Sequence, residues 1–320
     1  MEQLKLYEKP ELKKPCLVAA WPGMGNVALT AVHYLKDKLG ATPLGELTST
    51  EYFAPTGAIV AKQVILPPER PDNQFYYYSS PQCRNDILFF IGSIQPVPHR
   101  EYEFALELLK IAKMWGVSLV LTTAAAPSDM SYQDAPRVFA APNDPELLKK
   151  LMEYKVHFMG EGNIAGLNGL LVSAARGMNI DGICLLGEIP FFTAQIEFPK
   201  AALKVLEILT KLLGVRVDFL DLELLAAQKE KEIAPLAQIL SRGASAAPEG
   251  EKEAAAEEKV VPADADKDVP RAVRMKIEKM FRDAESDGNY KIKMQLKEEL
   301  DRWGLFDEYQ DRFLDLFRRI

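Results

Sequence analysis

Cysteine and histidine are scarce in this sequence, which has three of each among its 320 residues. A disulfide framework needs cysteines in pairs, and a zinc site needs cysteine or histidine ligands a few residues apart. Here the cysteines are scattered, at Cys16, Cys83 and Cys184, and the histidines are far apart. The sequence therefore predicts no disulfide and no metal site. Cys16 and Cys184 fall in apolar runs, where we expect them to be small buried residues.

Long apolar runs and an excess of positive charge are also missing. No uninterrupted apolar stretch comes near the roughly 18 residues that a membrane-spanning helix requires. The first residues, MEQLKLYEKPELKKP, are polar and contain no signal-peptide core. The net charge of −7 leaves no general electrostatic footprint for nucleic acid. We therefore expect a cytoplasmic protein that neither spans a membrane nor binds nucleic acid.

Apolar runs typical of buried strands alternate with segments whose apolar residues recur every three or four positions, as in core-facing helices. This alternation predicts a mainly parallel sheet with helices on both faces. The segment 58–79 is interpreted as a hairpin inserted into that sheet. Expected strands are 16–20, 44–47, 58–66, 75–79, 86–91, 118–122, 137–140 and 183–186, and expected helices are 27–39, 101–115, 145–154, 164–174, 201–213 and 220–239.

The composition changes abruptly after Leu240. Residues 241–268 contain almost no large apolar side chain, which is typical of a disordered linker. Helical stripes return beyond it, so we predict an α/β domain at 1–240, a linker at 241–268 and a helical segment at 269–320. A segment this short buries little of its own surface, so it is expected to dock on the main domain, a neighbouring subunit or a partner. The aromatic residues predicted to bind a partner are Phe306, Tyr309, Phe313 and Phe317.

The stretch from 160 to 203 contains more structural and functional motifs than any other part of the sequence. It reads as a glycine-rich turn, an amphipathic helix, a buried strand and a second helix opened by Pro199. Glycine in a helix costs up to about 1 kcal/mol relative to alanine, so Gly162, Gly166 and Gly169, on or near the expected helix, suggest close approach to another helix, a partner or a ligand. Glu188 ends the strand, at the edge where open α/β sheets bind ligands.

Residues near the predicted strand ends form a candidate ligand pocket. Segment 23–28 fits G-x-G-x-x-A between a strand and a helix, the placement of a dinucleotide-binding turn, with Glu46 about 20 residues further on. However, Pro22 removes an N–H donor from that turn, so a tight turn in which Gly25 or Asn26 caps the helix is favoured. The pocket candidates are Gly23, Gly25, Asn26, Ser93, Glu161, Asn163 and Glu188.

Two carboxylates in one cleft would suit general acid–base chemistry, and Glu161 and Glu188 could form such a pair, with Asn163 and Asn168 beside them. The favoured alternative is that Glu188 caps a backbone group while Glu161 is solvated. Ser93 also follows a strand, but no histidine and aspartate are spaced as its triad partners. We therefore assign no catalytic residue and expect no cofactor.

Four segments carry a resemblance to a known family. They are Trp21–Val27, the small-residue turn and helix at 160–172, LLGEIPF at 185–191 and PKAA at 199–202, in this order between residues 17 and 217. Together they resemble the proteasome assembly chaperone 2 family, some members of which carry an ATP-grasp label. The resemblance implies a three-layer α/β/α fold similar to that of nucleoside phosphorylases, a tendency to form homo-oligomers, and a chaperone or scaffold role. No glycine-rich phosphate loop or metal-binding carboxylate pair in this sequence supports the ATP-grasp label.

The chain departs from the family at its end. Archaeal assembly factors of this family are thought to dock on the proteasome through a hydrophobic–tyrosine–any-residue tail, whereas this sequence ends Arg318-Arg319-Ile320. Docking by such a tail is therefore not expected, and the C-terminal part is interpreted as a tethered arm that reaches a partner. We predict a non-enzymatic homo-oligomer that binds itself and an unidentified protein. The alternative is a small-molecule enzyme or nucleotide-binding protein with a phosphorylase-like pocket at the strand ends.

Overall fold

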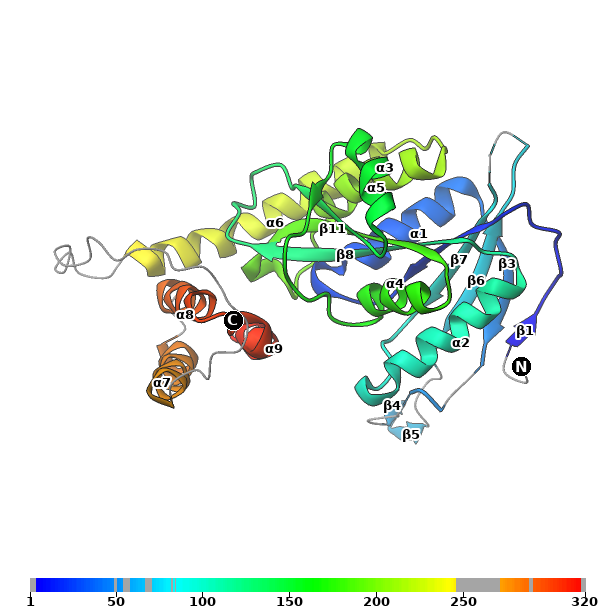
Figure 1. Ribbon diagram of the computed structural model, residues 1–320. Coiled ribbons are helices and arrows are strands. Elements are labelled where there is room, and N and C mark those ends of the chain that lie inside the picture. Colours follow the sequence, from blue (N-terminus) through cyan, green and yellow to red (C-terminus); the bar gives the residue numbers. More distant parts are fainter. Residues whose placement is uncertain are drawn as a thin grey trace. The chain divides into compact units, whose positions relative to one another are not determined.

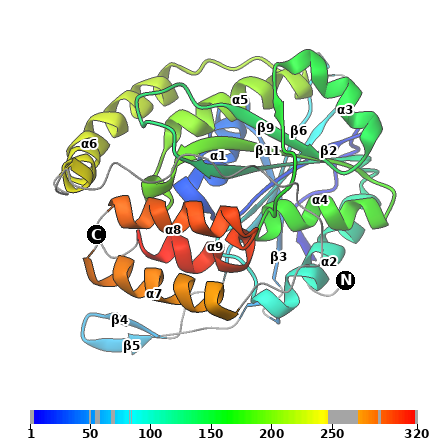
Figure 2. The same ribbon diagram turned by 60° about the vertical axis from the view of Figure 1, so that its left-hand side comes forward.

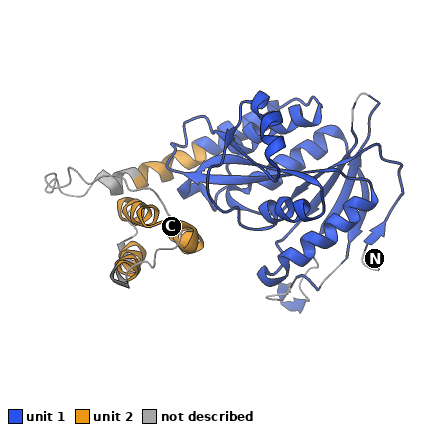
Figure 3. Ribbon diagram, in the orientation of Figure 1, with its two compact units in different colours: residues 1–230 blue, residues 231–320 orange. Residues whose placement is uncertain are grey.

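The computed structural model describes residues 4–48, 51–53, 58–66, 71–81, 83, 85–245, 271–287 and 290–317. It divides into two compact units, residues 1–230 and 231–320 (Figure 3), and each is treated by itself below. Within the described residues, no helix combines the length and apolar content needed to cross a bilayer. The end of the chain, residues 318–320, and most of the expected linker, residues 246–268, lie outside the described part.

Unit 1 is built on a nine-stranded sheet in the order β1-β3-β6-β7-β2-β8-β11-β9-β10. Its centre is parallel and consists of β7 (Ile87–Gly92), β2 (Cys16–Ala20), β8 (Leu119–Ser128) and β11 (Asp181–Pro190). On one side the sheet continues antiparallel through β6 (Asn73–Tyr78), β3 (Thr42–Leu47) and β1 (Leu4–Leu6). On the other side β9 (Val138–Pro142) is antiparallel to β11, and β10 (His157–Phe158) is parallel to β9.

Helices cover both faces of this sheet, which confirms the expected three-layer α/β/α fold (Figure 1). Helices α1 (Val27–Leu39) and α5 (Pro199–Leu213) contact each other on one face, and α2 (Glu101–Met114) and α4 (Leu167–Gly177) contact each other on the opposite face. The shorter helical elements are α3 (Pro145–Leu151), η1 (Met24–Asn26), η2 (Pro98–Arg100), η3 (Met152–Tyr154) and η4 (Phe191–Thr193).

The central strands are apolar along their whole length because helices cover both of their faces. All five residues of β2 and all six of β7 are buried. In α1, Val27, Ala31 and Leu35 recur every fourth position and are fully buried, as their spacing predicts. Gly40 then ends the helix with φ 65°, the left-handed cap expected from the sequence. In β2, β7 and α1, the residues that the sequence pattern predicts to be buried are therefore the ones that pack in the core.

The two cysteines that were expected to be buried are buried. Burial raises the pKa of the Cys16 thiol and of the Cys184 thiol to about 12, whereas Cys83 is partly exposed. Because the thiolate is the reactive form, we expect Ellman's reagent to modify Cys83 quickly and the other two only after unfolding. Counting fast and slow thiols in native and denatured protein checks this, and three fast thiols in the native protein would contradict it.

One expected strand is a separate hairpin. Residues 58–66 form β4 (Ile59–Ala61) and β5 (Val64–Leu66), which pair only with each other as a two-stranded antiparallel sheet. The connecting residues Lys62 and Gln63 have φ 51° and 67°, so the turn lacks the glycine or asparagine that usually signals such geometry. The interpretation of 58–79 as one inserted hairpin is wrong, because β6 joins the main sheet between β3 and β7.

The composition break at Leu240 is not a break in secondary structure, because α6 (Leu220–Ser245) runs through it. Beyond residue 270 the expected helical segment is present as α7 (Arg271–Asp287), α8 (Tyr290–Arg302) and α9 (Phe306–Asp315), which lie side by side (Figure 2). Their apolar stripes form the core of unit 2, where Ile277, Phe281, Leu296, Leu300 and Phe313 are each 0% exposed. The proposed linker between the two ordered parts stays a prediction.

Candidate functional site

The turn between β2 and α1 lies at the carboxyl edge of the central strands. Gly25 and Asn26 both adopt left-handed backbone conformations, with φ 61° and 51°. The Gly25 N–H donates to the Ala194 carbonyl at 2.9 Å, and the Gly25 carbonyl accepts from the Phe198 N–H at 2.9 Å. Asn26 Nδ2 donates to Glu197 Oε1 at 3.0 Å. The turn is therefore bound to residues 194–198, and a phosphate there would have to displace Ala194 and lie near the Glu197 carboxylate.

Two side-chain amides tie α4 to the loop after β2. Asn168, which is 4% exposed, accepts from the Trp21 N–H at 3.1 Å and donates through Nδ2 to the Trp21 carbonyl at 3.2 Å. Gln95 Nε2 donates to the Pro22 carbonyl at 2.8 Å, and its Oε1 accepts from the Leu167 N–H at 3.2 Å. These bonds satisfy backbone groups that burial would otherwise leave unpaired. Both amides therefore connect α4 to the end of β2, and their hydrogen-bonding groups already have partners within the chain.

Glu188 is enclosed at the ends of β8 and β11, where the residue is 2% exposed. Its carboxylate accepts from Ser128 Oγ at 2.9 Å, from the Arg137 N–H at 3.1 Å, and from Arg137 Nε and Nη2 at 2.9 and 2.5 Å. Burial by itself raises the pKa of Glu188, but the hydrogen bonds from Arg137 and Ser128 outweigh it, so the pKa lies below its ordinary value. An ionised and fully bonded carboxylate is poorly suited to general acid–base work.

The lowered pKa of Glu188 predicts a specific acid response. A carboxyl whose folded pKa is depressed stabilises the native state above its unfolded pKa of about 4.3, and this stabilisation is lost as the pH falls through the folded pKa. Glu188→Gln should therefore lower the free energy of unfolding at pH 7 by about 1–3 kcal/mol, since Arg137 is half-exposed and partly screened. Urea unfolding at pH 7 and pH 3 should show the difference shrinking in acid.

The control for this experiment is Glu161→Gln, because Glu161 is exposed. We expect that variant to change stability by less than about 0.5 kcal/mol at either pH. A Glu188→Gln protein as stable as the wild type at pH 7 would mean that the Arg137 and Ser128 bonds contribute nothing net.

The remaining pocket candidates, Ser93, Glu161, Asn163 and Gly23, lie on three separate loops. Ser93 is exposed after β7, where its Oγ accepts from the Asp72 N–H at 2.8 Å. Glu161 and Asn163 are exposed on the loop after β10, and within the described part of the chain no hydrogen bond or ion pair joins them to Glu188. Gly23 is exposed in the turn after β2. Whether any of these residues binds a ligand stays a prediction.

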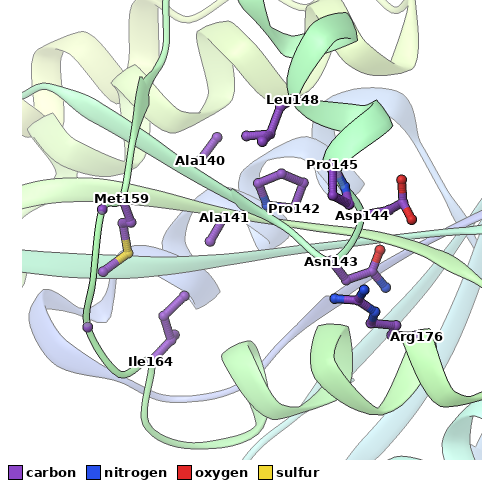
Figure 4. A pocket seen from close by; sticks show the side chains of 12 residues that line it. Ala140, Ala141, Pro142, Asn143, Asp144, Pro145, Leu148, Met159, Ile164 and Arg176 are labelled. Carbon is purple, nitrogen blue, oxygen red and sulfur yellow. The ribbon is translucent and has the colours of Figure 1, made fainter. Parts of the chain in front are cut away.

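A cavity of about 340 Å³ lies where β9, α3, the loop after β10 and α4 meet (Figure 4). We call it the β9–α4 cavity. None of the seven candidate residues, all of which the structure describes, contributes to its lining. The sequence offered one hint, since Gly160 and Gly162 of the glycine-rich turn line it. The full lining is Ala140, Ala141, Pro142, Asn143, Asp144, Pro145, Leu148, Met159, Gly160, Gly162, Ile164 and Arg176.

The β4–β5 hairpin exposes aliphatic side chains. Val60 and Ile65 are directly paired across the strands and are 69% and 72% exposed, and Val64 is 57% exposed. Neither strand contains a charged residue. A two-stranded hairpin is marginally stable alone in water, and exposed apolar surface marks sites of association. The signal in the sequence was the continuous apolar character of both strands, because a strand with one solvated face normally alternates.

The four C-terminal aromatic residues contribute to the interior of unit 2. Phe313 is 0% and Phe317 6% exposed, and their ring centroids are 5.7 Å apart. Phe306 packs against Phe313 at 5.5 Å, and Tyr309 stacks on Phe281 at 5.5 Å. Only Phe306 and Tyr309 are partly exposed. These residues hold the helices together, and their contact with a partner stays a prediction.

The residues described here contain no cluster of three or more histidine, cysteine, aspartate or glutamate side chains placed to hold a metal ion.

The sequence of unit 1 matches a known protein family. A model of the PAC2 family matches residues 17–237. An uncharacterised protein of Methanocaldococcus jannaschii is 28% identical over 231 residues, which cover 72% of this chain and 85% of that protein. Helices α7–α9 lie beyond the part that the family model matches.

Solved structures show the same fold. PbaB of Pyrococcus furiosus, an archaeal proteasome activator, is 28% identical with a TM-score of 0.64, and the match covers 73% of this chain and 97% of PbaB. PbaA of the same organism, an archaeal homolog of proteasome-assembly chaperone, is 24% identical with a TM-score of 0.58, covering 76% of this chain and 95% of PbaA. The likeness to PbaA bears on the fold alone.

Proposed function

Because this chain belongs to the PAC2 family, we propose that it is a non-enzymatic protein that associates with itself and binds other proteins during their assembly. The related PbaB is a proteasome activator, which supports a role with protein rather than small-molecule partners. The polar groups at the strand ends agree with this proposal, because Gly25, Asn168 and Glu188 already have partners within the chain. The partner itself and the cytoplasmic location stay predictions.

The β4–β5 hairpin is the observation that carries the proposal. It presents uncharged aliphatic strands to solvent, and among the described residues its two strands pair with each other alone, without the charge or proline by which natural proteins protect strand edges. Burying a large aliphatic side chain contributes about 1.5–3 kcal/mol, so a few such residues can dominate a contact. We assign the hairpin as a contact surface for association.

The double substitution Val60→Thr and Ile65→Thr tests this assignment. Threonine retains β-branching and strand propensity but makes the paired face polar. We expect self-association to weaken about ten-fold or more, as measured by sedimentation velocity over a concentration series. Met152→Gln is the control, because Met152 is equally exposed at 69% but lies in η3. Equal association of the double variant and the wild type would overturn the role of the hairpin.

The alternative is a nucleotide or small-molecule site at the strand ends. A thermal-shift screen against nucleotides, dinucleotides and phosphate tests it, because a ligand at about 100 times its dissociation constant stabilises the native state by about 2.7 kcal/mol. Under our proposal the screen is flat. A saturable shift that Glu188→Gln abolishes would instead favour the alternative.

A further inference from the structure

The β9–α4 cavity has an apolar end and a charged end. Figure 4 shows Met159 and Ile164 at one end and Asn143, Asp144 and Arg176 at the other, with Ala140 and Ala141 of β9 between them. Its volume of about 340 Å³ lies within the usual range for small-molecule sites. The cavity therefore fits a ligand that has an apolar body and a polar head.

The polar groups at the charged end differ in availability. The Asn143 side chain already has hydrogen-bond partners within the chain. Its Nδ2 donates to the carbonyls of Val172 and Ile180 at 3.0 Å, and its Oδ1 accepts from the Gly182 N–H at 2.9 Å. Asp144 caps α3 with one oxygen, Oδ1, which accepts from the Glu146 N–H at 2.8 Å. Its second oxygen has no hydrogen bond from the described residues. Arg176 is exposed in the last turn of α4 and likewise has no ion pair or side-chain hydrogen bond among the described residues.

The exposed Arg176 guanidinium and the second carboxylate oxygen of the half-buried Asp144 lie at the charged end of this cavity, where together they complement a zwitterion. Arginine recognises carboxylates through two parallel hydrogen bonds, and an aspartate oxygen accepts from an ammonium. We propose that the β9–α4 cavity binds a free α-amino acid with a large apolar side chain. Arg176 takes the α-carboxylate, Asp144 takes the α-ammonium, and the side chain lies against Met159, Ile164 and Leu148. This site is separate from the hairpin and does not rest on the proposed protein-binding function.

Glycine at position 162 suits such a site, because it brings the covering loop close to the apolar end. Gly162 has φ 152°, and a Cβ there would lie 3.1 Å from the Met159 Cε. The backbone thus leaves room for the Met159 side chain, whose flexible thioether adapts to ligands of different shape. We therefore expect leucine, isoleucine and methionine to bind comparably and alanine to bind much more weakly.

Isothermal titration of the full-length protein with leucine, alanine, leucinamide and N-acetyl-leucine tests the assignment. Leucine should bind roughly fifty-fold more tightly than alanine, since three more carbons are buried at about 0.8 kcal/mol each. Leucinamide lacks the carboxylate and N-acetyl-leucine lacks the ammonium, so each should bind about ten-fold or more weakly than leucine. Equal binding of the four compounds, or no heat with any of them up to millimolar concentration, would overturn the proposal.

Three variants separate the two charges from general effects. Arg176→Gln should weaken leucine binding about ten- to hundred-fold. Asp144→Asn retains a good helix cap, so it should leave the fold intact while removing the preference for leucine over N-acetyl-leucine. Arg216→Gln makes the same charge change at an exposed arginine outside the cavity and should bind leucine normally. Unchanged leucine binding in both cavity variants would contradict the assignment.

Discussion

Replacing Gly169 by alanine is expected to destabilise unit 1 by about 3 kcal/mol, through overpacking against the chain's own backbone. A Cβ at Gly169 would lie 2.4 Å from the Ile164 carbonyl oxygen and 2.5 Å from Ile164 Cγ2. Real Cβ atoms do not approach backbone this closely, so α4 and the loop before it must separate. In a unit of this size the melting temperature should fall by roughly 10 °C, measured by differential scanning calorimetry.

Gly177 is the matched control because it lies at the end of the same helix. A Cβ there would meet nothing within 4 Å. Gly177→Ala should stabilise the protein by up to about 1 kcal/mol, since alanine restricts the unfolded chain and favours the helix. Two alanine substitutions in one helix are thus expected to act in opposite directions. If both stabilised the protein, the close packing of Ile164 on α4 would be wrong.

Replacing Phe313 by alanine is expected to unfold helices α7–α9. The ring is 0% exposed and packs against Phe306 and Phe317, so its removal should cost about 3–5 kcal/mol. A three-helix unit of this size has only about 3–5 kcal/mol of stability in total. Limited proteolysis should therefore cut the variant between residues 271 and 317, whereas unit 1 should stay resistant.

Trp303→Ala provides the comparison for Phe313→Ala. Trp303 is 39% exposed, and its contact is a hydrogen bond from Nε1 to Glu299 at 3.1 Å. We expect its replacement to cost less than about 1 kcal/mol and to leave the proteolysis pattern unchanged. Loss of unit 1 together with α7–α9 in the Phe313 variant would contradict the prediction that residues 1–240 form a domain of their own.

Features that depend on neighbours in the sequence could be predicted. The helix at 27–39 with its Gly40 cap and the buried strand from Cys16 follow from side-chain periodicity and turn chemistry, which are local properties. The family resemblance rests on short segments in a fixed order, and the matched family model confirms it. The sequence also favoured a Glu188 side chain that caps a backbone group, and the Glu188 carboxylate does accept from the Arg137 N–H.

The predictions that failed or missed a feature concern pairing between distant segments. The sequence identified 58–66 as extended but could not show that this segment leaves the main sheet, because pairing partners are set by register and not by local pattern. Lys293 illustrates the same limit. It is 1% exposed, its Nζ donates to the Leu316 carbonyl at 2.7 Å, and burial lowers its pKa, although a lysine in a helix is normally assigned to the solvated face.

The amino-acid sequence by itself therefore determined the alternating α/β pattern, the family and the presence of C-terminal helices, because each is encoded over a few neighbouring residues. The tertiary structure alone decided that Arg137 and Ser128 donate hydrogen bonds to the Glu188 carboxylate and that Arg176 and Asp144 line the same cavity. It also decided that the β4–β5 hairpin stays outside the sheet with its aliphatic side chains in solvent. Such arrangements arise when segments far apart in the chain are brought together, and the free energy that selects them depends on burial that no local pattern records.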